Sequence, residues 1–171
     1  MTFKFVSLFL LIAGIAYFTL SSTKIMQYVA AISSQFALKA LYGLDSSIAF
    51  SQFPSPNPVI LTPRLSAEIV DLCAGILELA VLAGIVFASF EKKMGYRIKG
   101  FALGLLLLLV FNALRISTTI YYFDLGNLEW SAALHDFLFR LLLIVVIVTY
   151  YAIWYFYDIP RKKRKRNRRH K

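Results

Sequence analysis

Three residues able to carry covalent chemistry lie at or near the ends of long apolar runs: Cys73, Arg115 and His135. Cys73 is the only cysteine, and the chain's second histidine stands in the C-terminal tail. A thiol can act as a nucleophile, an imidazole as an acid and base, and a guanidinium as a stabiliser of negative charge. Together the three groups suit acyl transfer, provided that the fold brings them to one place.

Further polar residues lie deeper inside the apolar runs. Asn112 precedes Arg115 by one helical turn, so the two would form a polar stripe that faces the interior of a helix bundle. Glu78 and Arg140 each lie five residues deeper than a reactive residue. We expect them at matched depth as a buried ion pair, which would brace two helices or take part in the chemistry.

The composition is that of an integral membrane protein. Of 171 residues, 59% are hydrophobic, whereas soluble domains are closer to half apolar. The length suits one bundle. A single cysteine excludes an intramolecular disulfide and a four-cysteine zinc site, and we expect no metal and no organic cofactor.

A basic tail ends the chain. Residues 161–171 hold nine of the 19 Lys and Arg and no acid. Such a run can bind nucleic acid, but directly after an apolar segment it is typical of a topology anchor resting on anionic lipid. We therefore expect a membrane bundle over residues 1–159, a cytoplasmic tail over residues 160–171, and no nucleic-acid partner.

Four apolar runs are about long enough to cross a bilayer as helices, which predicts an all-α polytopic bundle. They cover residues 5–20, 73–90, 100–122 and 137–157. The first could be a cleaved signal peptide, although we prefer a retained helix. Residues 23–44 have apolar positions at helical spacing interrupted by polar ones, which indicates an interfacial helix or a weak span.

Residues 45–70 hold four of the five prolines and are too polar to span. Two short apolar runs, residues 47–53 and 59–61, flank a turn and could pair as a small β-hairpin. This hairpin could bind an extended peptide by strand addition, or it could simply cap the bundle.

The charged loops predict the orientation. The loop after residue 90 carries four basic residues, Lys92, Lys93, Arg97 and Lys99. The positive-inside rule places this loop and the tail in the cytoplasm. The Pro-rich segment and the three reactive residues then lie at the extracytoplasmic face. If a helix begins at Cys73, Asp71 would cap it and place the thiol in the first turn.

Short motifs around the reactive residues resemble a known family. They are CAGI at residues 73–76, NALRI at 112–116 and HDFLFR at 135–140. Their order and spacing resemble the three conserved blocks of the exosortase/archaeosortase family. The stretch that leads into CAGI, from residue 59, also resembles the extended region before the family cysteine. The resemblance covers residues 59–142, about half of the chain.

This resemblance implies a membrane cysteine protease with transpeptidase activity. Its substrates would be secreted proteins whose C-terminus carries a short motif, a transmembrane helix and a basic cluster. The enzyme would cut near the outer face and join the new C-terminus to a lipid acceptor. Cys73 would be the nucleophile, His135 the acid and base, and Arg115 the third essential group. The chain departs from the family pattern in having Ala74 where serine is common, and in the short interval from Arg115 to His135.

Two other classes of function fit parts of the sequence. A non-catalytic membrane assembly factor or lipid-binding scaffold would use the basic tail and the polar stripe but not the thiol. A small transporter would line a path with Glu78, Asn112, Arg115 and Arg140, and it would be expected to show an internal repeat, which the sequence lacks.

Overall fold

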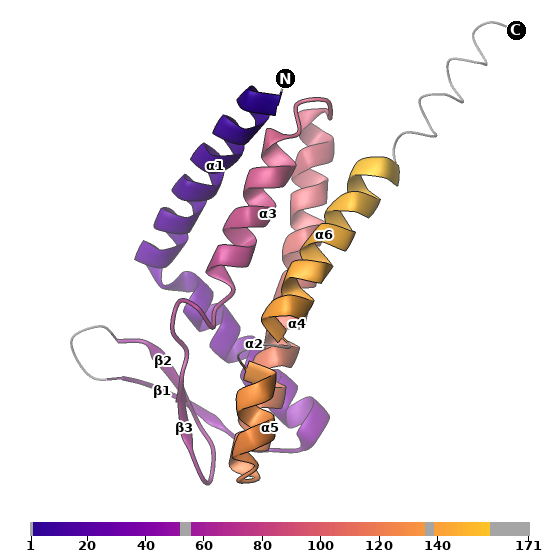
Figure 1. The fold of residues 1–171 in the computed structure, drawn as a ribbon. Coiled ribbons are helices and arrows are strands. Elements are labelled where there is room, and N and C mark those ends of the chain that lie inside the picture. Colours follow the sequence, from indigo (N-terminus) through magenta and orange to yellow (C-terminus); the bar gives the residue numbers. More distant parts are fainter. Residues whose placement is uncertain (1, 52–55, 136–138, 158–171) are drawn as a thin grey trace, which may run out of the picture.

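The structure is a computed structural model, and it describes residues 2–51, 56–135 and 139–157. Helices and one small sheet follow one another along the chain (Figure 1). In order they are α1 (Thr2–Thr23), α2 (Ile25–Tyr42), β1 (Ser47–Phe50), β2 (Pro58–Leu61), β3 (Ser66–Glu68), α3 (Ile76–Ala88), α4 (Met94–Asp124), α5 (Leu128–Ala133) and α6 (Phe139–Tyr157).

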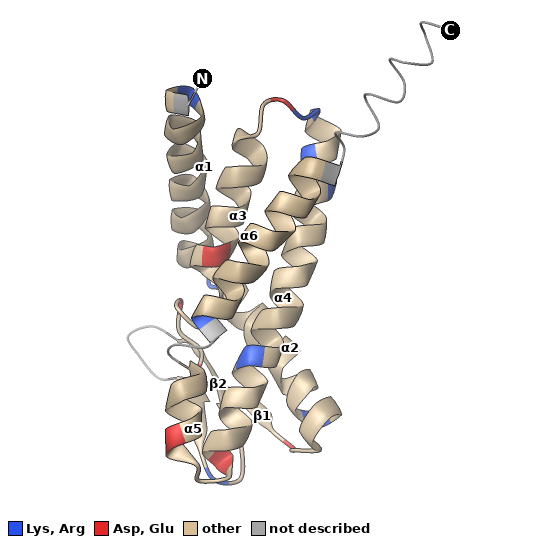
Figure 2. Ribbon diagram, turned by 45° about the vertical axis from the view of Figure 1, so that its right-hand side comes forward, with Lys and Arg blue, Asp and Glu red and all other residues tan. Residues whose placement is uncertain are grey.

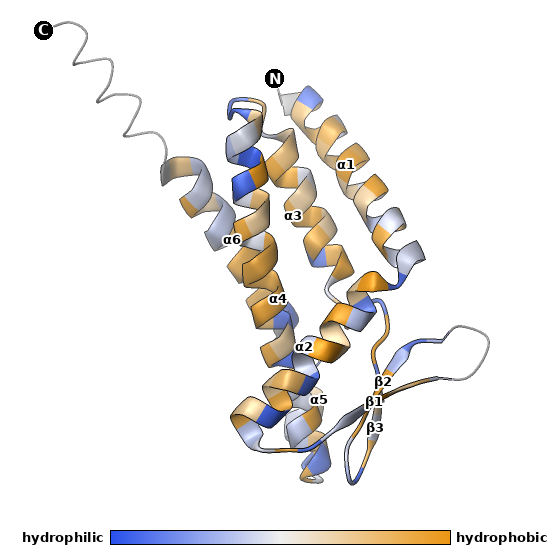
Figure 3. Ribbon diagram, turned by 180° about the vertical axis from the view of Figure 1, so that it is seen from behind, coloured by the Kyte–Doolittle hydropathy of each residue, from blue (hydrophilic) through white to orange (hydrophobic). Residues whose placement is uncertain are grey.

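Helices α1, α3, α4 and α6 run side by side, and α2 crosses them at an angle (Figures 1 and 3). Within the described residues, two helices are long and apolar enough to cross a membrane, Phe3–Thr23 and Met94–Asp124, while Ile76–Ala88 and Arg140–Phe156 are shorter apolar helices. The mostly helical fold predicted from the sequence is confirmed, and the count of four spans stays a prediction.

Helix α3 is shorter than the predicted span over residues 73–90. It begins at Ile76 and has 13 residues, a length of about 20 Å at 1.5 Å per residue. The preceding residue, Gly75, has φ 73°, in the left-handed region that interrupts a helix. Cys73 therefore lies in a turn before α3, and the prediction that Asp71 caps a helix beginning at Cys73 is wrong.

Asp71 instead ties this turn to the junction of α1 and α2. Its carboxylate accepts hydrogen bonds from Ser21 and Gln27 and forms an ion pair with Lys24 at 3.2 Å. Lys24 has φ 57°, a left-handed conformation that breaks the helical path between α1 and α2. Helix α2 is not among the helices apolar enough to span, which favours its interpretation as an interfacial helix.

The Pro-rich segment forms a three-stranded antiparallel sheet in the order β1-β2-β3. The predicted hairpin is present as β1 and β2, with Ile48 opposite Ile60. The third strand, β3, was not predicted and places Ala67 opposite Ile60. Strand β2 is therefore central, and Ile60 is fully buried in the core beneath it.

Asp124, the last residue of α4, fixes the sheet to the bundle. Its carboxylate accepts from the Thr62 hydroxyl at 2.7 Å and from the Arg64 backbone N–H at 3.2 Å. The Arg64 guanidinium donates to the Asp124 carbonyl at 3.2 Å. Because these residues form the turn between β2 and β3, the contact holds β3 beside the last turns of α4.

The sheet and the basic loop lie at opposite ends of the bundle. Lys and Arg gather at the connection between α3 and α4, while the sheet and α5 lie at the other end (Figure 2). The helices between them are predominantly apolar (Figure 3). The predicted tail, residues 160–171, and most of the turn between β1 and β2 lie outside the described residues.

Candidate active site

The turn that carries Cys73 is built from backbone hydrogen bonds. The Val70 carbonyl accepts from the N–H groups of Cys73 at 2.9 Å and Ala74 at 3.1 Å. Gly75 then takes its positive φ, which costs a residue with a side chain roughly 1 kcal/mol or more. An added Cβ at Gly75 would lie 3.5 Å from the Asn112 side chain, an ordinary packing distance. The positive φ, rather than a lack of space, therefore favours glycine at this position.

Asn112 holds this turn in place. It is buried, with 4% of its surface exposed, and its Nδ2 donates to the Cys73 carbonyl at 3.0 Å. The hydrogen bond joins two segments far apart in the sequence. The predicted polar stripe on α4 is therefore formed, and its first member fixes the backbone of the thiol-bearing residue.

The structure brings Cys73 and His135 into contact. The Cys73 Sγ lies 3.8 Å from the His135 Nε2, close enough for a thiol or thiolate to exchange a proton with the imidazole in a tightened complex. Cys73 is half-buried, so the sulfur is neither sealed in the core nor fully in solvent.

A short helix that was not predicted positions His135. The histidine follows α5 and does not open α6, which begins at Phe139. The Asn127 side chain caps α5 by accepting from the Trp130 N–H at 3.4 Å. Ser131 is fully buried and donates to the Thr119 carbonyl at 3.4 Å. Because Ser131 is one helical turn before His135, this bond docks the histidine-bearing segment on α4.

Arg115 lies in the same place. Its side chain is 2% exposed, and it borders a cavity of about 120 Å³ together with Cys73 and His135. Strand β3, the residue after it and the last turns of α4 complete the lining: Ala67, Glu68, Ile69, Ile116, Thr119, Ile120 and Phe123. A guanidinium in such low-dielectric surroundings acts more strongly on a nearby negative charge than it would in water.

Asp71 lies two residues before Cys73, and a free carboxylate there would oppose formation of a thiolate. A hydrogen bond from Ser21 holds the pKa of the Asp71 carboxyl below its ordinary value of 3.8, and bonds from Lys24 and Gln27 act in the same direction. Asp71 is therefore ionised but matched by the Lys24 ammonium at 3.2 Å. The ion pair reduces the field of the carboxylate at the sulfur.

The predicted pair of Glu78 and Arg140 is not formed. Within the described residues the ion pairs are Lys24–Asp71 and Lys39–Asp45. Arg140 is exposed at the start of α6, where a long basic side chain can reach the membrane interface. The prediction was based on the depth of the two residues along their helices. It did not take into account that Arg140 lies on an exposed face of α6.

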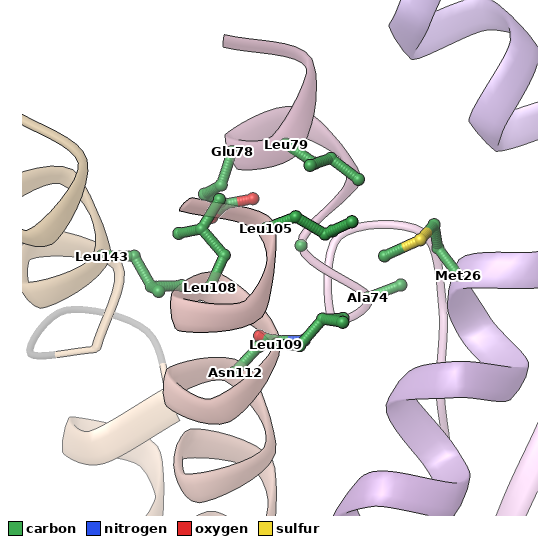
Figure 4. A pocket seen from close by; sticks show the side chains of 10 residues that line it. Met26, Ala74, Glu78, Leu79, Leu105, Leu108, Leu109, Asn112 and Leu143 are labelled. Carbon is green, nitrogen blue, oxygen red and sulfur yellow. The ribbon is translucent and has the colours of Figure 1, made fainter. Parts of the chain in front are cut away.

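Glu78 instead borders a second, very small cavity of about 10 Å³ beneath the Cys73 turn (Figure 4). Figure 4 shows its side chain among leucines, with Asn112 at the lower edge of the same space. Leu143 of α6 lines the cavity and is 2% exposed. Apolar packing, rather than a cation, therefore meets Glu78 from this side.

The part of the chain that the structure describes contains no group of three or more His, Cys, Asp or Glu side chains placed to hold a metal ion.

Sequence reasoning missed the residues that position the site. Ser131, Thr119 and strand β3 were not proposed from the sequence. The N-cap Asn127 before LEWSAA was a readable signal for α5. The Thr-Pro-Arg turn after β2 was a signal for a second hairpin. The contact between Ser131 and Thr119 had no signal, because a single buried serine does not reveal its partner.

Comparison with known proteins shows the family to which the chain belongs. A family model described as transmembrane exosortase matches residues 1–158. The match extends well beyond the half of the chain that carries the motifs, and it includes α1, α2 and the sheet. No curated protein and no solved structure shows a significant match to the chain.

Proposed function

Since this chain belongs to the transmembrane exosortase family, we propose that it is a membrane cysteine peptidase and transpeptidase. It cleaves the C-terminal sorting signals of secreted proteins and transfers the new C-terminus to a lipid acceptor. The observation that carries the proposal is the 3.8 Å contact between Cys73 Sγ and His135 Nε2 beside the buried Arg115.

The first half-reaction forms a thioester. His135 accepts the proton of the Cys73 thiol, and the sulfur attacks the scissile carbonyl carbon. Arg115 stabilises the negative charge on the sulfur or on the carbonyl oxygen. The carbon–nitrogen bond then breaks, and the imidazolium of His135 returns its proton to the leaving amine, which is the N-terminus of the released helix.

The second half-reaction frees the enzyme. A hydroxyl or amine of the acceptor attacks the thioester carbonyl and gives its proton to His135. The carbon–sulfur bond breaks, and the Cys73 thiolate recovers the proton. Water in place of the acceptor would give hydrolysis. Asn112 acts as a positioning residue, because its hydrogen bond fixes the Cys73 carbonyl rather than contacting the substrate.

The proposed setting is a bundle of four spans, α1, α3, α4 and α6, with both termini in the cytoplasm. The basic loop between α3 and α4 supports this orientation by the positive-inside rule. The sheet, α5 and the cavity then lie at the extracytoplasmic face. The basic tail rests on anionic lipid.

The test follows processing of a secreted reporter that ends in an extended linker, an apolar helix and a basic cluster drawn from proteins co-expressed with this chain. Cys73→Ser and Cys73→Ala should abolish processing. Arg115→Lys keeps the charge but loses the guanidinium geometry, and we expect a loss of about 100-fold or more. His135→Gln should reduce processing by about the same factor.

The alternative, a non-catalytic membrane assembly or lipid-binding scaffold, makes the opposite prediction for the thiol. A scaffold should keep its cellular function in Cys73→Ser at an unchanged protein level. A covalent intermediate separates the two proposals directly. The wild-type protein mixed with the reporter and hydroxylamine should release a hydroxamate of the shortened reporter, and Cys73→Ala should release none.

A further inference from the structure

The hydrogen bonds of β3 reveal which of its backbone groups face away from the sheet. The Ile69 N–H donates to the Pro58 carbonyl, and the Thr62 N–H donates to the Leu65 carbonyl, both at 2.9 Å. Bonded and non-bonded pairs alternate along an antiparallel ladder. Ala67, opposite Ile60, is therefore a bonded position that faces β2.

Ser66 and Glu68 are the non-bonded positions of this ladder, so their backbone groups point away from β2. Strand β3 has one neighbour in the sheet, so the N–H and C=O groups of these two residues point toward its open edge. The backbone groups of Val70, two residues after Glu68, also point away from β2, and the Val70 carbonyl accepts from the N–H groups of Cys73 and Ala74. The open edge of β3 thus leads directly into the turn that carries the nucleophile.

This edge borders the cavity that holds the reactive groups. Ala67 and Glu68 line it together with Cys73, Arg115 and His135. No residue of β1 lines this cavity, although β1 is the other edge strand. The Glu68 carboxylate accepts from Asn57 Nδ2 at 2.7 Å and from Ser51 at 3.3 Å. Its charge is therefore engaged by the connection between β1 and β2.

We propose that the open edge of β3 binds the substrate peptide as an added strand. The occupant is the extended segment of a secreted protein that precedes its transmembrane helix. Backbone groups of this segment pair with those of Ser66 and Glu68, and the scissile carbonyl then reaches Cys73. The inference rests on the proposed function, and it assigns recognition to β3 rather than to the hairpin of β1 and β2.

Two features of the edge suit this occupant. Backbone pairing is largely independent of side-chain identity, so one edge can accept different secreted proteins. Strand β3 has three residues and one charge, and both a short length and a charge limit unselective edge pairing. It contains no lysine or proline, and Asn57 binds the Glu68 carboxylate at 2.7 Å, so the backbone groups of the edge remain able to pair. The cavity of about 120 Å³ has room for several waters or a small side chain of the added strand.

A tethered peptide tests the pairing without any turnover. Cys73 is the only cysteine, so a short threonine- and valine-rich peptide activated as a thiopyridyl disulfide forms a mixed disulfide at Cys73 and releases thiopyridone. The measurement is amide hydrogen exchange of Ser66 and Glu68, compared with protein capped as a methyl disulfide. We expect exchange to slow by about fivefold or more, the factor that one net hydrogen bond supplies.

The control peptide is N-methylated at alternate amides, which removes its donors on one edge. When the methyl groups lie on the edge of the peptide that faces β3, this control should give the amides of Ser66 and Glu68 little protection from exchange. Equal exchange rates with the peptide and the methyl cap would overturn the inference. Protection that rises with protein concentration in the absence of peptide would also overturn it, because the edge would then pair with a second copy of the chain.

Proline substitutions test the same edge during processing. Ser66→Pro removes an outward N–H and should reduce processing at least tenfold, whereas Ser66→Ala should not. Ala67→Pro removes an N–H that faces β2, so it should lower thermal stability. A loss of stability in this variant and not in Ser66→Pro would support the register of β3. Folded Ser66→Pro that processes the reporter normally would overturn the inference.

The outcomes separate the inference from the proposed function. If Cys73→Ala stops processing while the tethered peptide leaves Ser66 and Glu68 unprotected, the function stands and the inference fails. If the peptide protects both amides while Cys73→Ala still processes the reporter, the edge binds peptide as inferred and the catalytic proposal fails.

Discussion

The contacts at the two ends of the bundle are centred on charges of opposite sign. At the end that carries the sheet, two carboxylates each join several segments. Asp71 binds the junction of α1 and α2 to the Cys73 turn, and Asp124 binds the turn between β2 and β3 to α4. Such charge-assisted hydrogen bonds are strong and directional, so they fix the positions of the groups that they join.

At the opposite end, cations rest on aromatic rings. The Lys92 Nζ lies 5.3 Å from the ring centroid of Tyr96 and 5.1 Å from that of Tyr155. Arg97 lies over Phe90 at 5.5 Å, and the Tyr96 and Trp154 rings stack at 5.2 Å. Arg97 also donates to the carbonyls of Lys92 at 2.8 Å and Phe87 at 3.0 Å, so charge-assisted hydrogen bonds occur at this end as well.

Under the proposed function, the two ends have different tasks. The sheet end must hold a sulfur, an imidazole and a guanidinium around one cavity. The other end, which the positive-inside rule assigns to the cytoplasm, would keep its basic side chains near the membrane surface. A substitution at the sheet end should therefore change both stability and the reactivity of Cys73, whereas one at the basic end should change stability alone.

The largest effect is expected for Asp71→Ala. It removes the partner of Ser21, Lys24 and Gln27, and Gln27 is fully buried. We expect a loss of about 2–4 kcal/mol in the free energy of unfolding and a changed rate of alkylation of Cys73. Thermal unfolding in detergent and iodoacetamide kinetics measure the two. The matched control is Asp45→Ala, whose ion pair with Lys39 is exposed at 2.8 Å. Equal effects of the two variants would contradict the role of Asp71.

Gly100→Ala probes the basic end. Its Cβ would lie 2.1 Å from Trp154 Nε1, so α4 and α6 would have to separate. We expect a loss of about 1–3 kcal/mol with an unchanged alkylation rate of Cys73 in the folded fraction. The control on the same helix is Gly95→Ala. Its Cβ meets nothing within 4 Å, so it should stabilise by about 0.5–1 kcal/mol. Slower or faster alkylation in Gly100→Ala would show that the two ends are coupled.

The acid limb of stability should also depend on Asp71. The pKa of the Asp71 carboxyl is lower in the folded protein than its ordinary value of 3.8. Protonation of this carboxyl therefore favours the unfolded state. Its contribution is complete above that ordinary value and is lost as the pH falls through the lower folded value. Wild-type protein should therefore lose more stability than Asp71→Asn between pH 5 and pH 3. Parallel curves for the two proteins would exclude Asp71 as a source of acid sensitivity.

The smallest effect is expected for Glu78→Gln, which lies between the two ends. A carboxylate paired with a buried arginine would cost about 3–5 kcal/mol to neutralise. Since the ion pair is absent and Glu78 is half-buried, we expect a change below about 1 kcal/mol. Thermal unfolding of Glu78→Gln and Arg140→Gln measures it. A large and equal loss in both variants would restore the pair that the sequence predicted.

The sequence predicted the positions of the main helices and the residues that share the cavity. Apolar length and loop charge were sufficient, because both follow from the membrane. They placed Cys73, Arg115 and His135 at one level without any knowledge of contacts. The predicted hairpin also formed, since alternating apolar runs around a Pro-rich turn depend on local chemistry.

Rotation about helix axes and the ends of helices were not predictable in the same way. Depth along the membrane can be counted in residues, but the face of a helix depends on its first residue and on its neighbours. The predicted pairing of Glu78 with Arg140 failed for this reason. The start of α3 at Ile76 follows the positive φ of Gly75, and Asn112 binds the turn before it through the Cys73 carbonyl, a contact between segments remote in the sequence.

The length of α4 has a consequence for how a substrate would be measured. This helix runs unbroken from Met94 to Asp124 and carries Arg97 at the basic end and Arg115 at the cavity. About 18 residues separate them, or roughly 27 Å at 1.5 Å per residue, close to the thickness of the hydrocarbon layer. If the proposed function holds, the length of α4 determines where along its sequence a substrate is cut. A substrate helix could lie alongside α4 with its own basic cluster level with Arg97. The peptide bond that reaches Cys73 would then be a fixed number of residues from that cluster, whatever the sequence of the substrate helix.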